Sequence, residues 1–189
     1  MIDMGGRGAA FESKGYSSAI KAAENRIYKD KVESAILLDR KGNTIFTESS
    51  NATNYVQFTA EQLAKMKDAN LTHNHPSNST FSGADISLLT YRELKTIRAT
   101  GENRTYQLTK INGDFPRNEF AKAFTEAYNR NKSITDKEYN KIRKYQHTNP
   151  ARYQRECESL SAKLNSLNSE WLKNNSKKYG YRYGVIERR

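Results

Sequence analysis

The sequence predicts an α/β domain followed by a basic helical tail. Short apolar runs alternate with stretches of helical periodicity up to about residue 130, which is typical of α/β or α+β domains. Beyond that point apolar residues recur three and four apart, and most of the excess positive charge is found there. We therefore expect a flexible N-terminus over 1–14, one domain over 15–130 and a helical tail over 131–189.

The first expected elements are a helix and a hairpin. Ala19, Ile20, Ala23 and Ile27 recur at helical spacing, which predicts a helix. The segment "VESAILLDRKGNTIFTES", residues 32–49, holds two apolar runs separated by Gly-Asn, which predicts a β-hairpin. The short run "YVQF", residues 55–58, predicts a further strand.

The next elements alternate between helix and strand. Thr59 and Gln62 occupy capping-box positions, so a helix is expected to begin there. The run "ANLTHNH" predicts a strand that Pro76 ends. Residues 82–94, "SGADISLLTYREL", predict a helix, and 105–111, "TYQLTKI", a strand.

The tail predicts two helical segments, 133–150 and 149–180. Asn149 and Pro150 suit the cap and first position of the second helix, and Gly180 suits its end. Its apolar residues form a short coiled-coil seam: Tyr153, Cys157, Leu160, Leu164, Leu167 and Trp171. We expect this seam to pack on the other tail helix, on the domain, or on a second copy as a homodimer. Cys157 is then a packed thiol.

The charge and composition of the chain indicate which partners it binds and in which cellular compartment it is found. The chain has 32 Lys and Arg against 21 Asp and Glu, a formal charge of +11. Fifteen basic and six acidic residues lie from Arg130 onward, which favours nucleic acid or another polyanion, or a phage structural protein, as a partner of the tail. A solvated helical face is the alternative. Without an apolar span, a signal peptide or a second cysteine, we expect no membrane association and a cytoplasmic location.

Two of the three histidines lie one residue apart in "LTHNHPSNSTFSGADISLL", residues 71–89. On a strand, His73 and His75 project from the same face, so both imidazoles can reach one metal ion. Asp85 in the first turn of the next helix can supply a third ligand. Ser82 can cap that helix and place a hydroxyl beside the substrate oxygen. Exposed strand-end histidines and an ordinary helix cap are the alternatives.

These residues resemble the JAMM (MPN-plus) metalloprotease motif, in which a glutamate joins His-x-His-Pro and Ser-x-x-Asp around one zinc. The wording "LTHNHPS" and "SGADI" resembles bacterial and phage-borne members most. The resemblance covers about residues 15–115 and implies a JAMM/MPN-like (cytidine-deaminase-like) sheet flanked by helices. It also implies Zn²⁺ ligands at His73, His75 and Asp85, with Ser82 on the oxyanion side.

The family's glutamate usually lies where a strand begins, and Glu33, directly before "SAILLD", matches that place. It would take a proton from the attacking water and deliver it to the leaving amine. Glu48 is the second candidate. Nine residues separate His75 from Asp85, one fewer than the family usually has, so the loop is expected to be tighter.

The function expected from this resemblance is a zinc-dependent peptidase or isopeptidase that hydrolyses a peptide or protein-conjugate substrate. Two alternatives remain open. One is a phage-, virion- or nucleic-acid-associated binding module that keeps the fold. The other is a toxin or counter-defence factor that deconjugates a host protein with the same chemistry.

Overall fold

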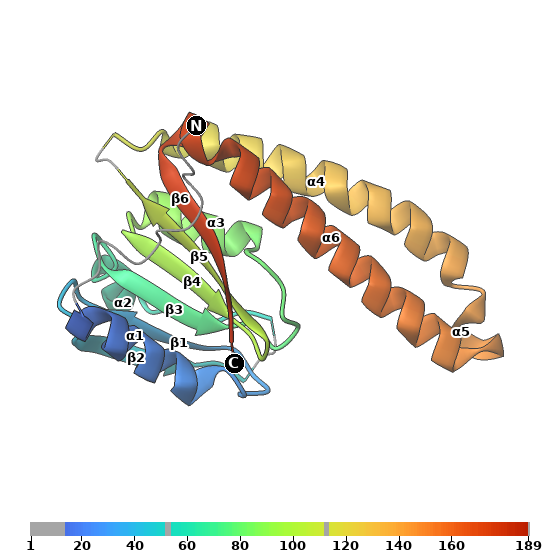
Figure 1. Ribbon diagram of the computed structural model, residues 1–189, viewed down its shortest axis with the longest axis horizontal. Helices are drawn as coiled ribbons and strands as arrows, with labels where there is room; N and C mark the ends of the chain where they lie inside the picture. The colour runs from blue at the N-terminus through green and yellow to red at the C-terminus, as the bar shows by residue number, and fades with distance from the viewer. Residues whose placement is uncertain (1–13, 52–53, 112–113, 189) are drawn as a thin grey trace, which may run out of the picture.

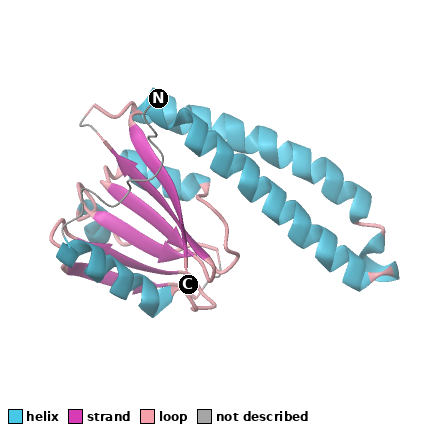
Figure 2. Cartoon of the chain, viewed as in Figure 1, coloured by secondary structure: helices cyan, strands magenta, loops and turns pink. Residues whose placement is uncertain are grey.

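The computed structural model describes residues 14–51, 54–111 and 114–188 as a mixed six-stranded sheet flanked by helices (Figures 1 and 2). The strand order is β2-β1-β3-β4-β5-β6, and only β3 and β4 are parallel neighbours. The strands are β1 (Ser34–Leu38), β2 (Thr44–Ser49), β3 (Asn70–Asn74), β4 (Thr96–Thr100), β5 (Arg104–Lys110) and β6 (Tyr181–Glu187). The helices are α1 (Lys14–Ile27), α2 (Ala60–Ala64), α3 (Gly83–Tyr91), α4 (Arg117–Ile142), α5 (Tyr145–Thr148) and α6 (Pro150–Tyr179). This confirms the α/β class and most of the expected elements.

The two faces of the sheet carry different cores. Side chains alternate between faces along a strand, so Ile36 and Leu38 of β1 point one way and Leu37 the other. The first pair packs on α1, against Ile20, Ala23 and Ile27. The opposite face holds the larger core, which includes residues of α3, α4 and α6. Every residue of β1, β3 and β4 is buried, as expected for strands covered on both faces.

The parallel pair β3–β4 positions the metal-ligand candidates. The chain leaves β3 at Asn74, and α3 provides the crossover to β4. α3 begins with Ser82 as its N-cap and Asp85 as the third residue of a capping box. The first turn of α3 therefore lies near the carboxyl end of β3, beside the two histidines.

Two local expectations differ from the structure. Residues 55–58 pair with no strand; Val56 and Phe58 instead pack against the large core, with Phe58 beside Phe46 of β2. β4, with the sequence "TIRAT", was not among the expected elements, and it carries the charged Arg98 in the middle of a buried strand. The structure neutralises that charge by pairing Arg98 with Glu24 of α1.

The tail is continuous with the domain. α4 and α6 form a long antiparallel helical arm that extends away from the sheet, with α5 at its far end (Figure 1). The expected boundary at residue 130 falls inside α4, and β6 returns to the sheet beside β5. Phe120 contacts the rings of Trp171, Tyr179 and Tyr181 at the base of the arm. Deleting 131–189 would therefore remove part of the core.

Of the three surfaces considered for the α6 seam, the structure uses the other tail helix, α4. Its residues are half-buried there, and the buried amide of Asn168 accepts a hydrogen bond from Asn131 Nδ2 at 2.9 Å. The expected helix signals are present: Asn149 accepts a hydrogen bond from Arg152 N, and Gly180 ends α6 at a φ of 71°. No helix within the described ranges combines the length and apolarity that crossing a bilayer requires.

The buried ion pair between α1 and β4 gives a first test of the fold. Arg98 Nε donates to Glu24 Oε1 at 2.6 Å, and both side chains are buried. Glu24→Gln leaves the guanidinium without its counter-ion, so we expect a loss of about 3–5 kcal/mol in the free energy of unfolding. Urea denaturation measures this, with the exposed Glu102→Gln as a control expected within about 0.5 kcal/mol of wild type. An equal effect of the two changes would contradict this role of the pair.

Candidate metal centre

His73 of β3, His75 directly after that strand and Asp85 of α3 converge beneath the surface. His73 and His75 lie on the large-core face of the sheet, and their rings meet edge to face with centroids 4.6 Å apart. Their Nε2 atoms are 2.8 Å apart. The three potential ligand atoms of His73, His75 and Asp85 all lie within 4.8 Å of one another, and all three residues are buried. The group could hold a metal ion, as expected from the sequence.

Asp85 faces both histidines with one carboxylate oxygen each. Its Oδ1 lies 2.9 Å from His73 Nε2, and its Oδ2 lies 3.5 Å from His75 Nε2. Ser82 fixes this orientation because its backbone N and its Oγ donate to Oδ2 at 2.7 and 2.8 Å. The predicted cap is thus present, and the Ser82 hydroxyl lies at the edge of the site.

The tautomer of His75 follows from its outer hydrogen bond. His75 Nδ1 lies 2.9 Å from the backbone oxygen of Ser79, which can only accept, so Nδ1 carries the proton. Burial, and the positive charge of His73, hold the pKa of His75 below its ordinary value. The ring is therefore neutral, and its Nε2 lone pair points at His73 and Asp85, as a metal ligand requires.

His73 and Asp85 form a charged pair. Burial opposes the charge on His73, but the charge and hydrogen bond of Asp85, together with the charge of Glu33, raise the pKa of His73. Burial also opposes the charge on Asp85, yet the nearby His73 and its hydrogen bond hold the pKa of that carboxyl well below its usual range. A positive charge thus already occupies the point where the three ligand atoms meet, which is where a cation would bind.

Glu33 lies directly before β1, as its place in the sequence predicted. β1 and β3 are antiparallel with Ala35 opposite His73, and continuing this register places Glu33 beside His75 on the same face. Burial raises the pKa of Glu33 to about 7, His73 lowers it and Asp85 raises it. The carboxyl is therefore close enough to feel the charges of two ligand candidates, and it titrates in the range suited to a general base.

Glu48 occupies a different environment. It is paired with Ala35 from the opposite edge of β1, so roughly 10 Å of sheet separates its backbone from that of His73. Its carboxylate accepts hydrogen bonds from Gln62 Nε2 at 2.7 Å and from Ser49 N at 3.2 Å. The bond from Gln62 ties Glu48 to α2, whereas no comparable bond is present at the Glu33 carboxyl within the described part of the chain.

Asn74, between the two histidines, is a residue whose role the sequence did not reveal. It points to the opposite face and is fully buried. Its Oδ1 accepts from Ser34 N at 2.6 Å, and its Nδ2 donates to the carbonyls of Asp30 and Val32 at 2.9 and 3.0 Å. Asn74 thereby fixes the segment that carries Glu33. In the "HNH" triplet, the two histidines are the ligand candidates, and the asparagine between them positions the Glu33 carboxylate.

Comparisons of the chain with protein-family models, with curated proteins and with solved structures find no match. The geometry of the described residues is therefore the support for a functional assignment.

Proposed function

We propose that the protein is a zinc-dependent hydrolase of amide bonds, a peptidase or isopeptidase of the JAMM type. The convergence of His73, His75 and Asp85 with Glu33 beside them carries this proposal. Once His73 gives up its proton to an incoming ion, two imidazoles and one carboxylate form a donor set that catalytic zinc uses while it keeps a further position open. The substrate class is a peptide or a protein conjugate.

The spacing of the ligand atoms fits such an ion. Zinc–ligand bonds of about 2.0–2.1 Å at tetrahedral angles place neighbouring ligand atoms about 3.3 Å apart. The three separations here are 2.8 Å between the histidines, 2.9 Å from His73 to Asp85 and 3.5 Å from His75 to Asp85. Adjustments of about half an ångström would accommodate the ion without moving the strands.

Glu33 and Ser82 would carry out the steps that the metal ion does not. Bound zinc supplies Lewis acidity toward a carbonyl and toward water. Glu33 accepts the proton of the attacking water and returns it to the leaving amine, for which a pKa near neutrality is suited. Ser82 has its hydroxyl at the edge of the site and can donate to the oxygen of the tetrahedral intermediate when it releases Asp85.

Metal analysis combined with cleavage screening tests this proposal. Protein purified without added metal is expected to contain about one zinc per chain and to cleave members of a peptide and isopeptide library. A chelator should abolish cleavage, and added zinc should restore it. The same donor set also binds non-haem iron(II), so iron in place of zinc, or zinc without any amide cleavage, would overturn the hydrolase assignment.

A second candidate function concerns the far end of the arm. Lys141, Arg143 and Lys144 are exposed there, and none has a carboxylate at ion-pair distance among the residues described. The ring of Tyr145 lies beside Lys144 and Arg152, whose cationic groups are 5.1 and 3.9 Å from its centroid. Of the two cations at this ring, Arg152 pairs with Glu156, whereas Lys144 has no carboxylate at ion-pair distance among the residues described. Exposed cations beside an aromatic ring suit contacts with phosphates and bases, so we propose that the arm end docks on nucleic acid.

Replacing Lys141, Arg143 and Lys144 together by glutamine is expected to weaken single-stranded DNA or RNA binding. The slope of log affinity against log salt should fall in magnitude by about 2, because each phosphate contact on a single strand contributes about 0.7. Lys173, Lys177 and Lys178, exposed near the base of the arm, provide a control of equal charge. Equal losses in the two triple variants, measured by fluorescence anisotropy across salt concentrations, would show that net charge alone is responsible.

A further inference from the structure

The loop that joins two of the ligand candidates is held by the helical arm. Residues 76–82 connect His75 to the first turn of α3, which carries Asp85. Within this loop Ser79 contacts the outer nitrogen of His75 twice, through its carbonyl at 2.9 Å and its Oγ at 3.1 Å. The conformation at residues 78–80 therefore determines where the His75 ring points.

One side of the loop rests on the turn between β4 and β5. Asn78 adopts a φ of 54°, and its Oδ1 accepts from Asn103 N at 3.3 Å. A Cβ built on Gly101 would lie 2.2 Å from that same oxygen, so glycine is required for the loop to approach. This contact fixes the loop at its beginning and leaves residues 79–80 to be fixed from the other side.

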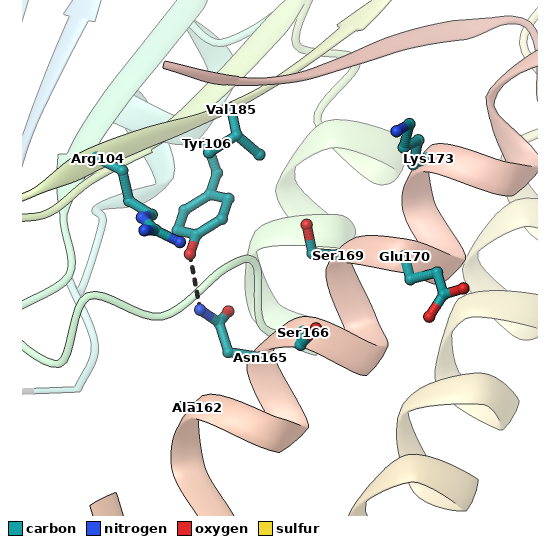
Figure 3. A pocket seen from close by; sticks show the side chains of 9 residues that line it. All are labelled: Arg104, Tyr106, Ala162, Asn165, Ser166, Ser169, Glu170, Lys173 and Val185. Atoms are coloured by element: carbon teal, nitrogen blue, oxygen red, sulfur yellow. Dashed lines mark hydrogen bonds between the residues drawn. The ribbon is translucent and has the colours of Figure 1, made fainter. Parts of the chain in front are cut away.

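α6 supplies that second contact through Asn165. Its Oδ1 accepts from the backbone N of Thr80 at 2.6 Å, and its Nδ2 lies 3.4 Å from the carbonyl of Asn78. The same Nδ2 donates to the hydroxyl of Tyr106 on β5 at 2.7 Å, a bond drawn in Figure 3. Asn165 thus links the arm, the sheet and the loop at the residues on either side of Ser79.

Asn165 also lies at the border of an open cavity. This cavity of about 490 Å³ lies between α6 and the strands β5 and β6 (Figure 3). Tyr106, which lines the cavity, is paired with Ala99 of β4, and Ala99 is paired with His73 of β3. The cavity and the ligand candidates therefore lie on the same face of the sheet, two strands apart. Because one side of the Asn165 side chain faces this cavity, a substitution of Asn165 should not create a void in the main hydrophobic core.

We propose that Asn165 is a positioning residue for the metal centre. It holds the backbone at Thr80 so that the Ser79 carbonyl keeps His75 in the tautomer and orientation that present Nε2 to the ion. This inference rests on the proposed metal-dependent function, and it makes α6 a part of the site. Among the three ligand candidates, His75 is the one whose outer nitrogen depends on this loop.

Asn165→Ala is expected to weaken zinc binding about tenfold, the lower end of the effect of losing an outer-shell partner. Competition with a chromophoric chelator measures the affinity, and the visible absorption of the cobalt-substituted protein reports ligand geometry. Asn168→Ala is the matched control: Asn168 lies one turn along α6 and is buried, but it bonds Asn131 of α4. It should lower the thermal midpoint while leaving zinc affinity and the cobalt spectrum unchanged.

Asn165→Asp keeps the oxygen that accepts from Thr80 N, so it should recover most of the affinity that alanine loses. Wild-type affinity and spectrum in Asn165→Ala, or equal losses in Asn165→Ala and Asn168→Ala, would overturn the positioning role while leaving the metal centre intact. If Asn165→Ala fails to fold, wild-type affinity and spectrum in Asn165→Asp support the role, and a loss as large as a ligand replacement counts against it. Absence of zinc binding in the wild-type protein would overturn the proposed function and this inference together.

Discussion

His73→Ala and His75→Ala are each expected to purify without bound metal, whereas His147→Ala should retain about one ion per chain. Each of the first two changes removes one of three ligand atoms from a buried group. Since loss of an outer-shell partner alone costs about 10–100-fold in affinity, loss of a ligand should exceed a hundredfold. Inductively coupled plasma mass spectrometry and zinc titration measure the effect.

His147 is a suitable control because it is exposed at the far end of the arm and is the only other histidine of the chain. Circular dichroism on all three variants separates metal loss from unfolding. Full metal content in both His73→Ala and His75→Ala would show that this group does not bind the ion.

Glu33→Gln is expected to retain the fold and the metal but to lose a hundredfold or more of the turnover number. The amide preserves the shape of the side chain and removes the group that accepts the proton, and general-base removal typically costs about 10²–10⁴-fold. Glu48→Gln should stay near wild type, because its carboxylate bonds Gln62 and Ser49. Both variants are assayed on the best substrate from the library screen, with zinc content measured in parallel.

The pH profile gives the same assignment a second readout. Burial raises the pKa of Glu33 in the metal-free site to about 7, and a nearby cation lowers it by favouring the carboxylate. The acid limb of the wild-type rate should therefore lie below pH 7 and vanish in Glu33→Gln. Activity that survives in Glu33→Gln but is lost in Glu48→Gln would reverse the two roles, and survival in both would remove the proton-shuttle step.

Much of the local structure was predictable because it depends on neighbours in sequence. Capping boxes at Thr59 and Ser82, the Asn149-Pro150 start of α6 and the Gly180 end of α6 are all formed within a few residues. The alternation of a strand placed His73 and His75 on one face, and a helix start placed Asp85 near them. The candidate ligand group was thus predictable from residues 73–85.

Only the tertiary structure could place the groups that reach the site from elsewhere. Asn74 bonds residues about forty positions away, and Asn165 bonds a loop more than eighty positions away. Neither pairing leaves a periodic signal in the sequence. Glu33 was expected at the site from its place before a strand. That Glu33 lies beside the histidines and Glu48 does not depends on the antiparallel registers of β1 with β2 and β3.

By itself, the sequence determined the α/β class, the caps, the convergence of His73, His75 and Asp85 and the basic character of the tail. The tertiary structure decided that β4 is a buried strand, that residues 55–58 are not a strand, and that the tail adds the edge strand β6 to the sheet. The physical reason is that periodicity and capping are local, whereas the neutralisation of Arg98 by Glu24, 74 residues away, is a long-range contact. The contact between the Asn165 amide of α6 and the backbone of Thr80, in the loop 76–82, is likewise long-range.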